Sequence, residues 1–342
     1  MTGTGKTPDT AAKTLKVVVV HTYRFFDLWS APEWVRERME RDFPQASVVQ
    51  LENLQQASSE ITDTDVFVGS VLEPRLFASA HRLKWIHSPA VGVHQLMFPE
   101  LVRSDVRVTN SRDVQGPIVA EHAIACVLAL AKRIPQCVRY QARAEWAQQT
   151  LWNEYPRPRE VAGSTVVVVG MGSIGREFAA RAKALGMKVL AVREDPSKGA
   201  NVADAVYGTD GLPGLLPEAD FVLLCTPVTP STTRLMNRDM IERMKSDAYV
   251  INVGRGALID EAAIIEALRE KRLGGAALDV FDREPLPPDS PFWSLENVLV
   301  TPHTAAASER LWEGHYALIK ENLTRFLDGR PLLNQVNKTL GY

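Results

Sequence analysis

The chain has 342 residues, of which 45% are hydrophobic, so it is long enough to form two domains with separate cores. Its net charge of -2, from 39 basic and 41 acidic residues, gives no broad positive field, which excludes nucleic acid and anionic membrane surfaces as expected partners. The cysteines Cys126, Cys137 and Cys225 form no C-x-x-C pair and have no histidine at ligand spacing, so we expect no metal site and reduced thiols in a cytoplasmic protein.

The N-terminal half contains a polar tail followed by a first α/β domain. Residues Met1–Thr14 are polar and lack the apolar segment of a signal peptide, so we expect a flexible tail. From Lys16 onward, β-branched runs such as KVVVVH and LKWIHS alternate with amphipathic stretches such as PEWVRERMERDF. This alternation predicts parallel strands joined by crossover helices. No apolar run is long enough to cross a bilayer.

A long helix and a second α/β series follow. The run GPIVAEHAIACVLALAKRI is apolar over most of its circumference, so we expect it to be buried between layers or between subunits. Strands are predicted at STVVVVG, KVLAV, ADFVLLC, DAYVINV, GAALDVF and NVLVTP. Ser308–Leu327 is predicted to be a helix that returns to the first domain. The predicted domains are residues 15–112 with 307–342, and residues 113–306, giving an α/β fold class with two doubly wound parallel sheets.

A glycine-rich turn in the second series predicts a dinucleotide site. Gly170, Gly172 and Gly175 form G-x-G-x-x-G, with Ser173 and Ile174 between the last two glycines. The motif closes an apolar strand, opens a helix and leads into another strand, which is the context that a Rossmann domain requires. The glycines allow a tight turn and a close approach of the backbone to pyrophosphate, and the helix N-terminus favours the anion.

Three ionisable residues follow predicted strands of the same domain. Arg255 follows AYVINV, Glu284 follows GGAALDVF and His303 follows NVLVTP. Any one of them alone is more plausibly a solvated or structural group. Together they match the reduction of a 2-keto acid, in which an arginine holds the carboxylate and polarises the ketone, and a histidine paired with a carboxylate donates the proton.

The motifs NVGRGALID, LDVFDREPL, VLVTPHTAA, GMGSIG and PLLNQVNKTLGY resemble the D-isomer-specific 2-hydroxyacid dehydrogenase family. The resemblance implies a Rossmann domain and a discontinuous flavodoxin-like substrate domain, and it makes Arg255, Glu284 and His303 the catalytic set. It implies a homodimer built partly on the helix around Glu121–Ala131. The cofactor-binding residues that it implies, beyond the glycine-rich turn, are Thr226 and Pro227 on the adenosine side, Val253 and Asp279 near the nicotinamide, and also Gly254 and Ala305.

The resemblance also implies a substrate loop at HSPAVGVHQL, where the backbone of Val91 and Gly92 would hold the substrate carboxylate. Similar enzymes for 3-phosphoglycerate carry an arginine where Ser88 stands, and phosphite dehydrogenases carry a lysine where Val91 stands. Because neither cation is present, we expect a keto acid with a small, uncharged side chain, as in glyoxylate, hydroxypyruvate or an aliphatic or aromatic 2-keto acid. Trp293 is equally consistent with a cap on the substrate site and with a core tryptophan.

Two questions remain open from the sequence. The first is cofactor choice: Arg193 stands where relatives that prefer NAD tend to have an aspartate, so we predict that NADP(H) is preferred and NAD(H) is possible, although Glu194 would reverse the choice if the alignment shifted by one residue. The second is turnover. Some corepressors resemble this family and use the dinucleotide mainly as a structural ligand, so the alternative function is a dinucleotide-binding regulatory protein with little turnover.

Overall fold

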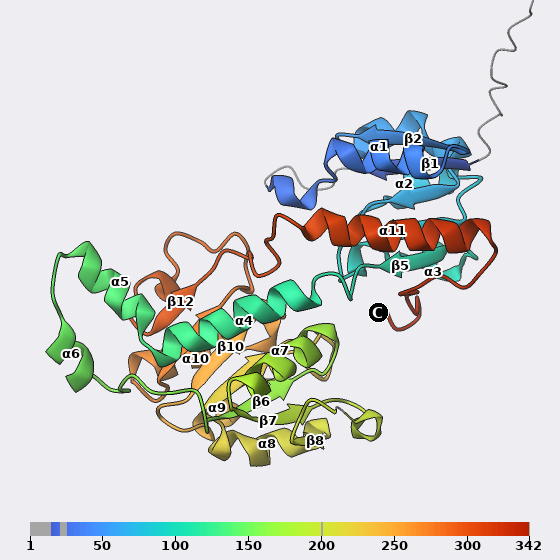
Figure 1. Ribbon diagram of the computed structural model, residues 1–342. Helices are drawn as coiled ribbons and strands as arrows, with labels where there is room; N and C mark the ends of the chain where they lie inside the picture. Colours follow the sequence, from blue (N-terminus) through green and yellow to red (C-terminus); the bar gives the residue numbers. More distant parts are fainter. Residues whose placement is uncertain (1–14, 21–25, 200, 342) are drawn as a thin grey trace, which may run out of the picture. The chain divides into compact units, whose positions relative to one another are not determined.

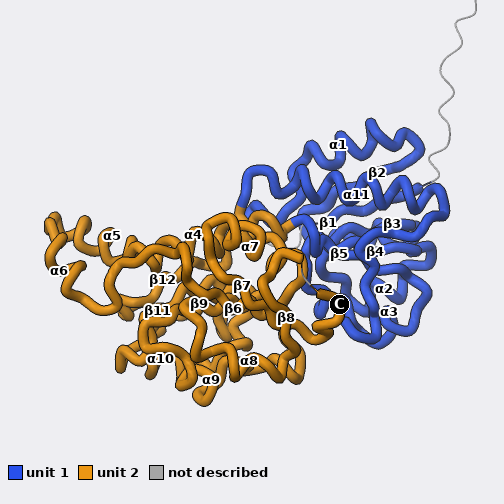
Figure 2. The backbone as a smooth tube through the Cα atoms, turned by 60° about the horizontal axis from the view of Figure 1, so that its bottom comes forward, with its two compact units in different colours: residues 1–114, 308–342 blue, residues 115–307 orange. Residues whose placement is uncertain are grey.

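The computed structural model describes residues 15–20, 26–199 and 201–341, so the predicted tail Met1–Thr14 lies outside the described residues. The chain divides into two compact units, unit 1 with residues 1–114 and 308–342 and unit 2 with residues 115–307 (Figure 2). Each unit contains one parallel sheet with helices packed against it (Figure 1). The predicted α/β fold class is therefore confirmed.

Unit 1 is built on a five-stranded parallel sheet in the order β2-β1-β3-β4-β5, the flavodoxin-like order. Helices α1 (Glu33–Asp42) and α11 (Leu311–Leu327) cover one face, where Val17 and Val19 meet Trp312 and Ile319. Helices α2 (Pro74–Ser79) and α3 (Pro99–Arg103) lie with the apolar cluster on the other face. The strands are β1 (Leu15–Val20), β2 (Ala46–Leu51), β3 (Val66–Val68), β4 (Trp85–Ser88) and β5 (Arg107–Asn110).

Unit 2 contains a seven-stranded parallel sheet in the order β12-β11-β10-β9-β6-β7-β8. The strand order reverses between β6 and β9, which is where dinucleotides bind in sheets of this type. The strands are β6 (Thr165–Val169), β7 (Lys188–Val192), β8 (Ala205–Tyr207), β9 (Phe221–Leu224), β10 (Tyr249–Asn252), β11 (Gly275–Leu278) and β12 (Val298–Val300). The helices are α4 (Gly116–Ala131), α5 (Ile134–Ala142), α6 (Gln148–Asn153), α7 (Ser173–Ala184), α8 (Leu212–Leu215), α9 (Arg238–Glu242) and α10 (Glu261–Arg269).

The long apolar run predicted as a helix forms α4 as far as Ala131, and a separate helix, α5, begins at the last residue of the run, Ile134. The break lies at Arg133, whose backbone is left-handed with φ 57°, and its guanidinium donates to the carbonyl of Pro156 and to Glu154. Pro135 contributes to the break, because it has no N–H to donate to the carbonyl of Ala131, which accepts from the N–H of Arg159 instead. Half of the residues of helix α4 are buried within unit 2, where the helix packs on α7, β10 and β11. Among the described residues, no helix is both long and apolar enough to cross a membrane.

Two histidines are buried in the polar interior of unit 1. Ser111 Oγ lies 3.2 Å from Nε2 of His87 and 3.0 Å from Nδ1 of His315, so this hydroxyl connects β4 with α11. Thr109 Oγ1 lies 2.8 Å from Nδ1 of His87 and accepts a hydrogen bond from the indole of Trp85. Burial lowers the pKa of His315 to about 4, and burial together with the charge of His315 lowers the pKa of His87 to about 3.

Unit 1 is expected to lose stability in acid because of these two histidines. Below about pH 6.5 the unfolded chain protonates both rings while the folded chain does not, so the free energy of unfolding falls by up to about 1.4 kcal/mol per pH unit and per ring, until the pH reaches the folded pKa. In urea titrations between pH 7 and pH 4.5, His315→Gln should therefore lose less stability than the unchanged chain. Parallel curves for the two proteins would contradict this account.

Candidate active site

The predicted site residues of unit 2 lie at one edge of its sheet. All seven strands are parallel, so the residues that follow their carboxyl ends are brought together along that edge. The strands lead into the following residues: β6 into Gly170–Gly175, β7 into Arg193, β9 into Thr226 and Pro227, β10 into Val253–Arg255, β11 into Asp279, and β12 into Thr301–Ala305.

The glycine-rich turn is packed too tightly for side chains. Gly170 has a φ of 106°, and a Cβ on Gly175 would lie 2.0 Å from the carbonyl oxygen of Gly170. A Cβ on Gly172 would have no neighbour within 4 Å, so the space in front of this glycine is open. Helix α7 begins at Ser173 with Gly172 as its N-cap, which directs the backbone N–H groups of Ser173 and Ile174 toward this space. This cradle fits a pyrophosphate group.

The loops after β9 and β10 extend the edge beside the glycine-rich turn. Thr232 Oγ1 donates to the carbonyl of Pro227 over 2.7 Å and so holds the turn that begins at Thr226. The N–H of Val253 donates to Leu224 over 3.2 Å, and a Cβ on Gly254 would lie 3.1 Å from the carbonyl oxygen of Thr226. The predicted cofactor-binding residues of these two loops are therefore neighbours.

Arg193 lies directly beyond the end of β7, beside the glycine-rich turn. Val192 pairs in register with Val169, and its carbonyl accepts a hydrogen bond from the N–H of Gly170 over 2.9 Å. The guanidinium of Arg193 donates to the carbonyl of Gly199 over 2.8 Å, which ties it to the loop that follows. Lys198 lies 3.7 Å from Asp195, the neighbour of the exposed Glu194.

The side chain of Arg255 is exposed, and the backbone around it is held in place by hydrogen bonds to a buried asparagine. Asn252 is buried, its Oδ1 accepts from the N–H of Gly254 over 3.0 Å, and its Nδ2 donates to the carbonyl of Arg255 over 2.9 Å. A Cβ on Gly256 would lie 2.0 Å from the carbonyl carbon of Phe281. The absence of a side chain at Gly256 thus lets the loop of Arg255 pack directly on the chain that leads to Glu284.

His303 and Glu284 form a hydrogen bond. Nδ1 of His303 lies 2.6 Å from Oε2 of Glu284, and Oε1 of the same carboxylate accepts from the N–H of Phe281 over 2.9 Å. An ionised carboxylate can only accept hydrogen bonds, so Nδ1 carries a proton and Nε2 is the nitrogen that can exchange a proton with another molecule. Both side chains are partly exposed, as reactive groups must be.

The charge of Glu284 is maintained by its surroundings. Burial of the carboxyl group by itself would raise its pKa, but the hydrogen bonds from His303 and Phe281 and the charges of His303 and Arg255 lower the pKa of Glu284 below its ordinary value. Glu284 is therefore a carboxylate at neutral pH. An arginine, a carboxylate and a histidine from three neighbouring loops thus influence one another electrostatically.

Asp279 is buried and its carboxylate accepts hydrogen bonds from the loop that carries His303. The donors are the hydroxyl of Thr301 at 2.6 Å and the N–H groups of Thr304 at 2.9 Å and Ala305 at 3.0 Å. The sequence pointed to Asp279 and Ala305 only as cofactor-binding residues. The polar residues Asn252 and Thr301 were missed, although a single asparagine inside the apolar strand AYVINV is a signal that could have been noticed.

The remaining predicted substrate residues come from two other segments of the chain. Val91 and Gly92 belong to unit 1, where Asn110 Nδ2 donates to the carbonyl of Val91 over 2.7 Å and Ser88 Oγ donates to Ala90. Trp293 lies in the 3₁₀ helix Pro291–Trp293 of unit 2, half-exposed, and its indole donates to the carbonyl of Pro287 over 2.9 Å. Trp293 is therefore not a core tryptophan, and its role as a cap stays a prediction.

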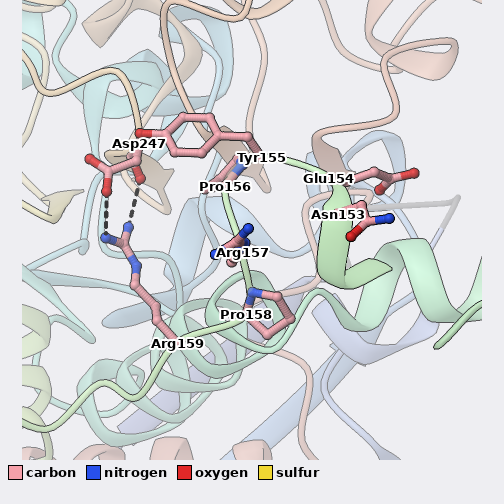
Figure 3. Close-up of a pocket in the computed structure, with 8 residues that line it drawn as sticks. All are labelled: Asn153, Glu154, Tyr155, Pro156, Arg157, Pro158, Arg159 and Asp247. Atoms are coloured by element: carbon pink, nitrogen blue, oxygen red, sulfur yellow. Dashed lines mark hydrogen bonds and ion pairs between the residues drawn. The ribbon is translucent and has the colours of Figure 1, made fainter. Parts of the chain in front are cut away.

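A cavity of about 390 Å³ lies away from the residues described above, at the segment that connects α6 with β6 (Figure 3). It is lined by Asp247 and by the consecutive residues Asn153, Glu154, Tyr155, Pro156, Arg157, Pro158 and Arg159. Arg159, one of the two arginines that line the cavity, donates hydrogen bonds to the side chain and to the carbonyl of Asp247. The cavity contains none of the predicted site residues.

Comparisons with known proteins identify the family of the chain. The family description "D-isomer specific 2-hydroxyacid dehydrogenase, NAD binding domain" matches residues 124–305. A D-3-phosphoglycerate dehydrogenase from Methanocaldococcus jannaschii is 35% identical over 81% of this chain, but the match spans only 52% of that protein. A glyoxylate reductase from Korarchaeum cryptofilum is 34% identical over 81% of this chain and 84% of its own length.

A solved structure is similar over nearly the whole chain. It is a D-isomer specific 2-hydroxyacid dehydrogenase from Xanthobacter autotrophicus Py2 in complex with NADPH and MES, and it aligns with a TM-score of 0.80 and 29% sequence identity. The alignment covers 95% of this chain and 99% of that one. The similarity therefore extends to both units and is not limited to the nucleotide-binding fold.

Proposed function

Because the chain belongs to the D-isomer specific 2-hydroxyacid dehydrogenase family, we propose that it is a 2-keto acid reductase that forms D-2-hydroxy acids with a nicotinamide dinucleotide. The observation that carries the proposal is the 2.6 Å hydrogen bond between His303 and Glu284. This pair lies at the edge of the unit 2 sheet that also carries Arg255 and the glycine-rich cradle. The glyoxylate reductase relative, which is matched over most of its length, supports this class of reaction.

Each of the three side chains has a distinct task in the proposed reaction. The guanidinium of Arg255 binds the substrate carboxylate and draws electron density from the neighbouring ketone. The cofactor, when bound, supplies a hydride to the carbonyl carbon. Nε2 of His303 transfers its proton to the carbonyl oxygen as the negative charge develops there, so the products are a hydroxyl group and a neutral imidazole. The carboxylate of Glu284 holds the ring in place and stabilises its protonated form.

The substrate we propose is small and has an uncharged side chain, as glyoxylate and hydroxypyruvate do. Ser88 is fully buried and its hydroxyl donates to the carbonyl of Ala90, and Val91 is apolar, so neither residue offers a cation to a phosphate group. This favours the glyoxylate reductase relative over the phosphoglycerate dehydrogenase as a guide to the substrate. The chain also spans only about half the length of the latter.

The first test is turnover by the purified protein and by His303→Ala. Oxidation of NADPH, followed by its absorbance, is expected with glyoxylate or hydroxypyruvate. His303→Ala should lower kcat by about 10²–10⁴ while the cofactor Kd changes by less than about twofold, because the proton donor acts on the transition state. The exposed His81, changed to Ala, serves as a control and should leave kcat unchanged. Cofactor binding without turnover across a panel of keto acids would instead favour the regulatory alternative.

We propose that NADPH is preferred over NADH. Arg193 follows β7 beside the glycine-rich turn, at the strand end where NAD-preferring enzymes usually have an acidic residue. A guanidinium at this edge can pair with a 2′-phosphate and stack on the adenine ring. Lys198 lies near Asp195, which leaves Glu194 as the competing acidic residue. The solved relative from Xanthobacter autotrophicus Py2, which is complexed with NADPH, supports the same choice.

The cofactor preference can be measured as the ratio of kcat/KM for NADPH to kcat/KM for NADH, with one fixed keto acid. Arg193→Ala should lower this ratio by roughly tenfold to a hundredfold, since a charge-assisted hydrogen bond contributes about 1.5–3 kcal/mol. The exposed arginine Arg75 in unit 1, changed to Ala, should leave the ratio unchanged. A preference for NADH in the unchanged chain would remove Arg193 from the proposed site.

We further propose a homodimer in which a second copy covers the arm formed by α5 and α6. Helix α4 exposes none of its large apolar side chains, whereas the arm exposes several that a monomer rarely leaves in contact with water. Trp146, between the two helices, is 92% exposed. The other exposed apolar residues of the arm and of the chain that follows it are Ile134, Val138, Trp152 and Tyr155.

Light scattering after size-exclusion chromatography should give twice the mass of the chain. Val138→Lys should shift the population toward monomer, because a charge would have to be buried in the dimer. Val138 is 55% exposed, and Leu340 in unit 1, at 58%, provides a matched control: Leu340→Lys should keep the dimer. A monomeric unchanged chain would refute the proposed dimer.

The cytoplasmic location is also part of the proposal. Cys126, Cys137 and Cys225 are free thiols in the described structure, and burial raises the pKa of Cys126 and of Cys225 to about 12. Such thiols are suited to a reducing compartment.

A further inference from the structure

His303 has an unusual backbone conformation. Its φ is 53°, in the left-handed region that a residue with a side chain rarely adopts. Two hydrogen bonds hold this conformation: the N–H of His303 lies 2.9 Å from the carbonyl oxygen of Asp279 and 3.0 Å from that of Thr301. The direction in which the imidazole leaves the backbone therefore depends on how the loop Thr301–Ala305 is attached to Asp279.

The attachment is a buried carboxylate with three hydrogen-bond donors from this loop. The side chain of Asp279 is 2% exposed and accepts hydrogen bonds from the Thr301 hydroxyl and from the N–H groups of Thr304 and Ala305. A buried carboxylate is costly unless it is well paired, so these bonds fix the loop on both sides of His303. Of the three donors, only that of Thr301 is a side-chain group; the other two are backbone N–H groups. A substitution of Thr301 therefore removes one donor and leaves the two backbone donors in place.

A second residue approaches the same hydroxyl group from α4. Nε2 of His122 lies 3.2 Å from Thr301 Oγ1 and 3.9 Å from Asp279 Oδ1. A hydroxyl group has one proton, and that of Thr301 is directed to Asp279, so Thr301 Oγ1 accepts from His122 and Nε2 of His122 carries a proton. Cys126 lies four residues further on the same face of α4, and the charge of Asp279 contributes to the raised pKa of its thiol.

We propose that Thr301 and His122 are positioning residues for His303: their chain of hydrogen bonds to Asp279 orients the imidazole for proton transfer. The proposal rests on the proposed reductase function and adds to it two residues that do not touch the substrate. The order of the chain is His122 Nε2–H to Thr301 Oγ1, and Thr301 Oγ1–H to Asp279 Oδ1. Removal of the hydroxyl leaves His122 without its acceptor and Asp279 with one donor fewer.

The test compares Thr301→Val, which keeps the shape and removes the hydroxyl, with Thr301→Ser, which keeps the hydroxyl. Thr301→Val is expected to lower kcat by on the order of tenfold to a hundredfold, because small misplacements of a catalytic group have effects of this size. The Kd for NADPH should change by less than about twofold, and Thr301→Ser should recover most of the rate. His122→Phe should lower kcat in the same sense, whereas His122→Gln keeps an N–H donor and should be less affected.

The control is Thr324→Val, the same substitution at a partly exposed threonine of α11 in unit 1 whose hydroxyl donates only to the backbone carbonyl of Lys320; it should leave kcat unchanged. Rates are divided by the number of sites that bind NADPH, so a loss of folded protein is not counted as a loss of rate. Equal kcat in Thr301→Val and the unchanged chain would overturn the proposal. A rate in Thr301→Ser as low as in Thr301→Val would also overturn it.

A second measurement separates this proposal from the proposed function. If the unchanged chain reduces no keto acid, the reductase function fails, and the positioning role is then judged by NMR. The proton on Nδ1 of His303, bound to Glu284, should give a downfield signal that is identified by its loss in His303→Ala. The signal should weaken or shift in Thr301→Val and return in Thr301→Ser. A signal that is identical in all Thr301 variants would overturn the positioning role.

Discussion

The candidate site depends on the parallel pairing of the strands in unit 2. Parallel strands have their carboxyl ends on the same edge, so short loops from β10, β11 and β12 become neighbours although they are far apart in the sequence. In an antiparallel sheet, half of these loops would lie at the opposite edge. The parallel pairing in turn requires crossover helices and strands that are apolar on both faces, which accounts for runs such as TVVVV in β6.

Close packing between the loops depends on positions that lack side chains. Gly256 rests on the backbone of Phe281, and Gly175 rests on that of Gly170, at distances where a Cβ would collide. These contacts connect the Arg255 loop to the Glu284 loop, and α7 to the end of β6. Such a contact also explains why Arg255 has a glycine beside it: Gly256 allows the backbone to approach Phe281, and Arg255 carries the charge.

The fold class and the three ionisable residues at the strand ends could be predicted from the sequence for physical reasons. Apolar runs with helical stretches between them define parallel α/β units, and strand ends collect functional groups, which led to Arg255, Glu284 and His303. The proposed positioning residues were harder to predict. Thr301 and His122 are ordinary in composition and lie far apart in the sequence, and only the three-dimensional arrangement shows that both approach Asp279. The exposed arm was also missed, because apolar residues in short helices are equally typical of a core.

The two acidic residues near His303 show how position determines the task of a carboxylate. Glu284 is partly exposed, faces the imidazole and has two strong hydrogen-bond partners, so a change in the charge of His303 acts directly on it. Asp279 is buried and accepts hydrogen bonds from three donors of the loop Thr301–Ala305. Its carboxylate therefore holds the backbone of that loop in place. A carboxylate that accepts a hydrogen bond from an imidazole can stabilise a positive charge on that ring, whereas one that accepts only from N–H groups and a hydroxyl group holds uncharged donors in place. The left-handed backbone of His303 lies between these two carboxylates: Asp279 maintains the conformation, and Glu284 uses the ring orientation that results from it.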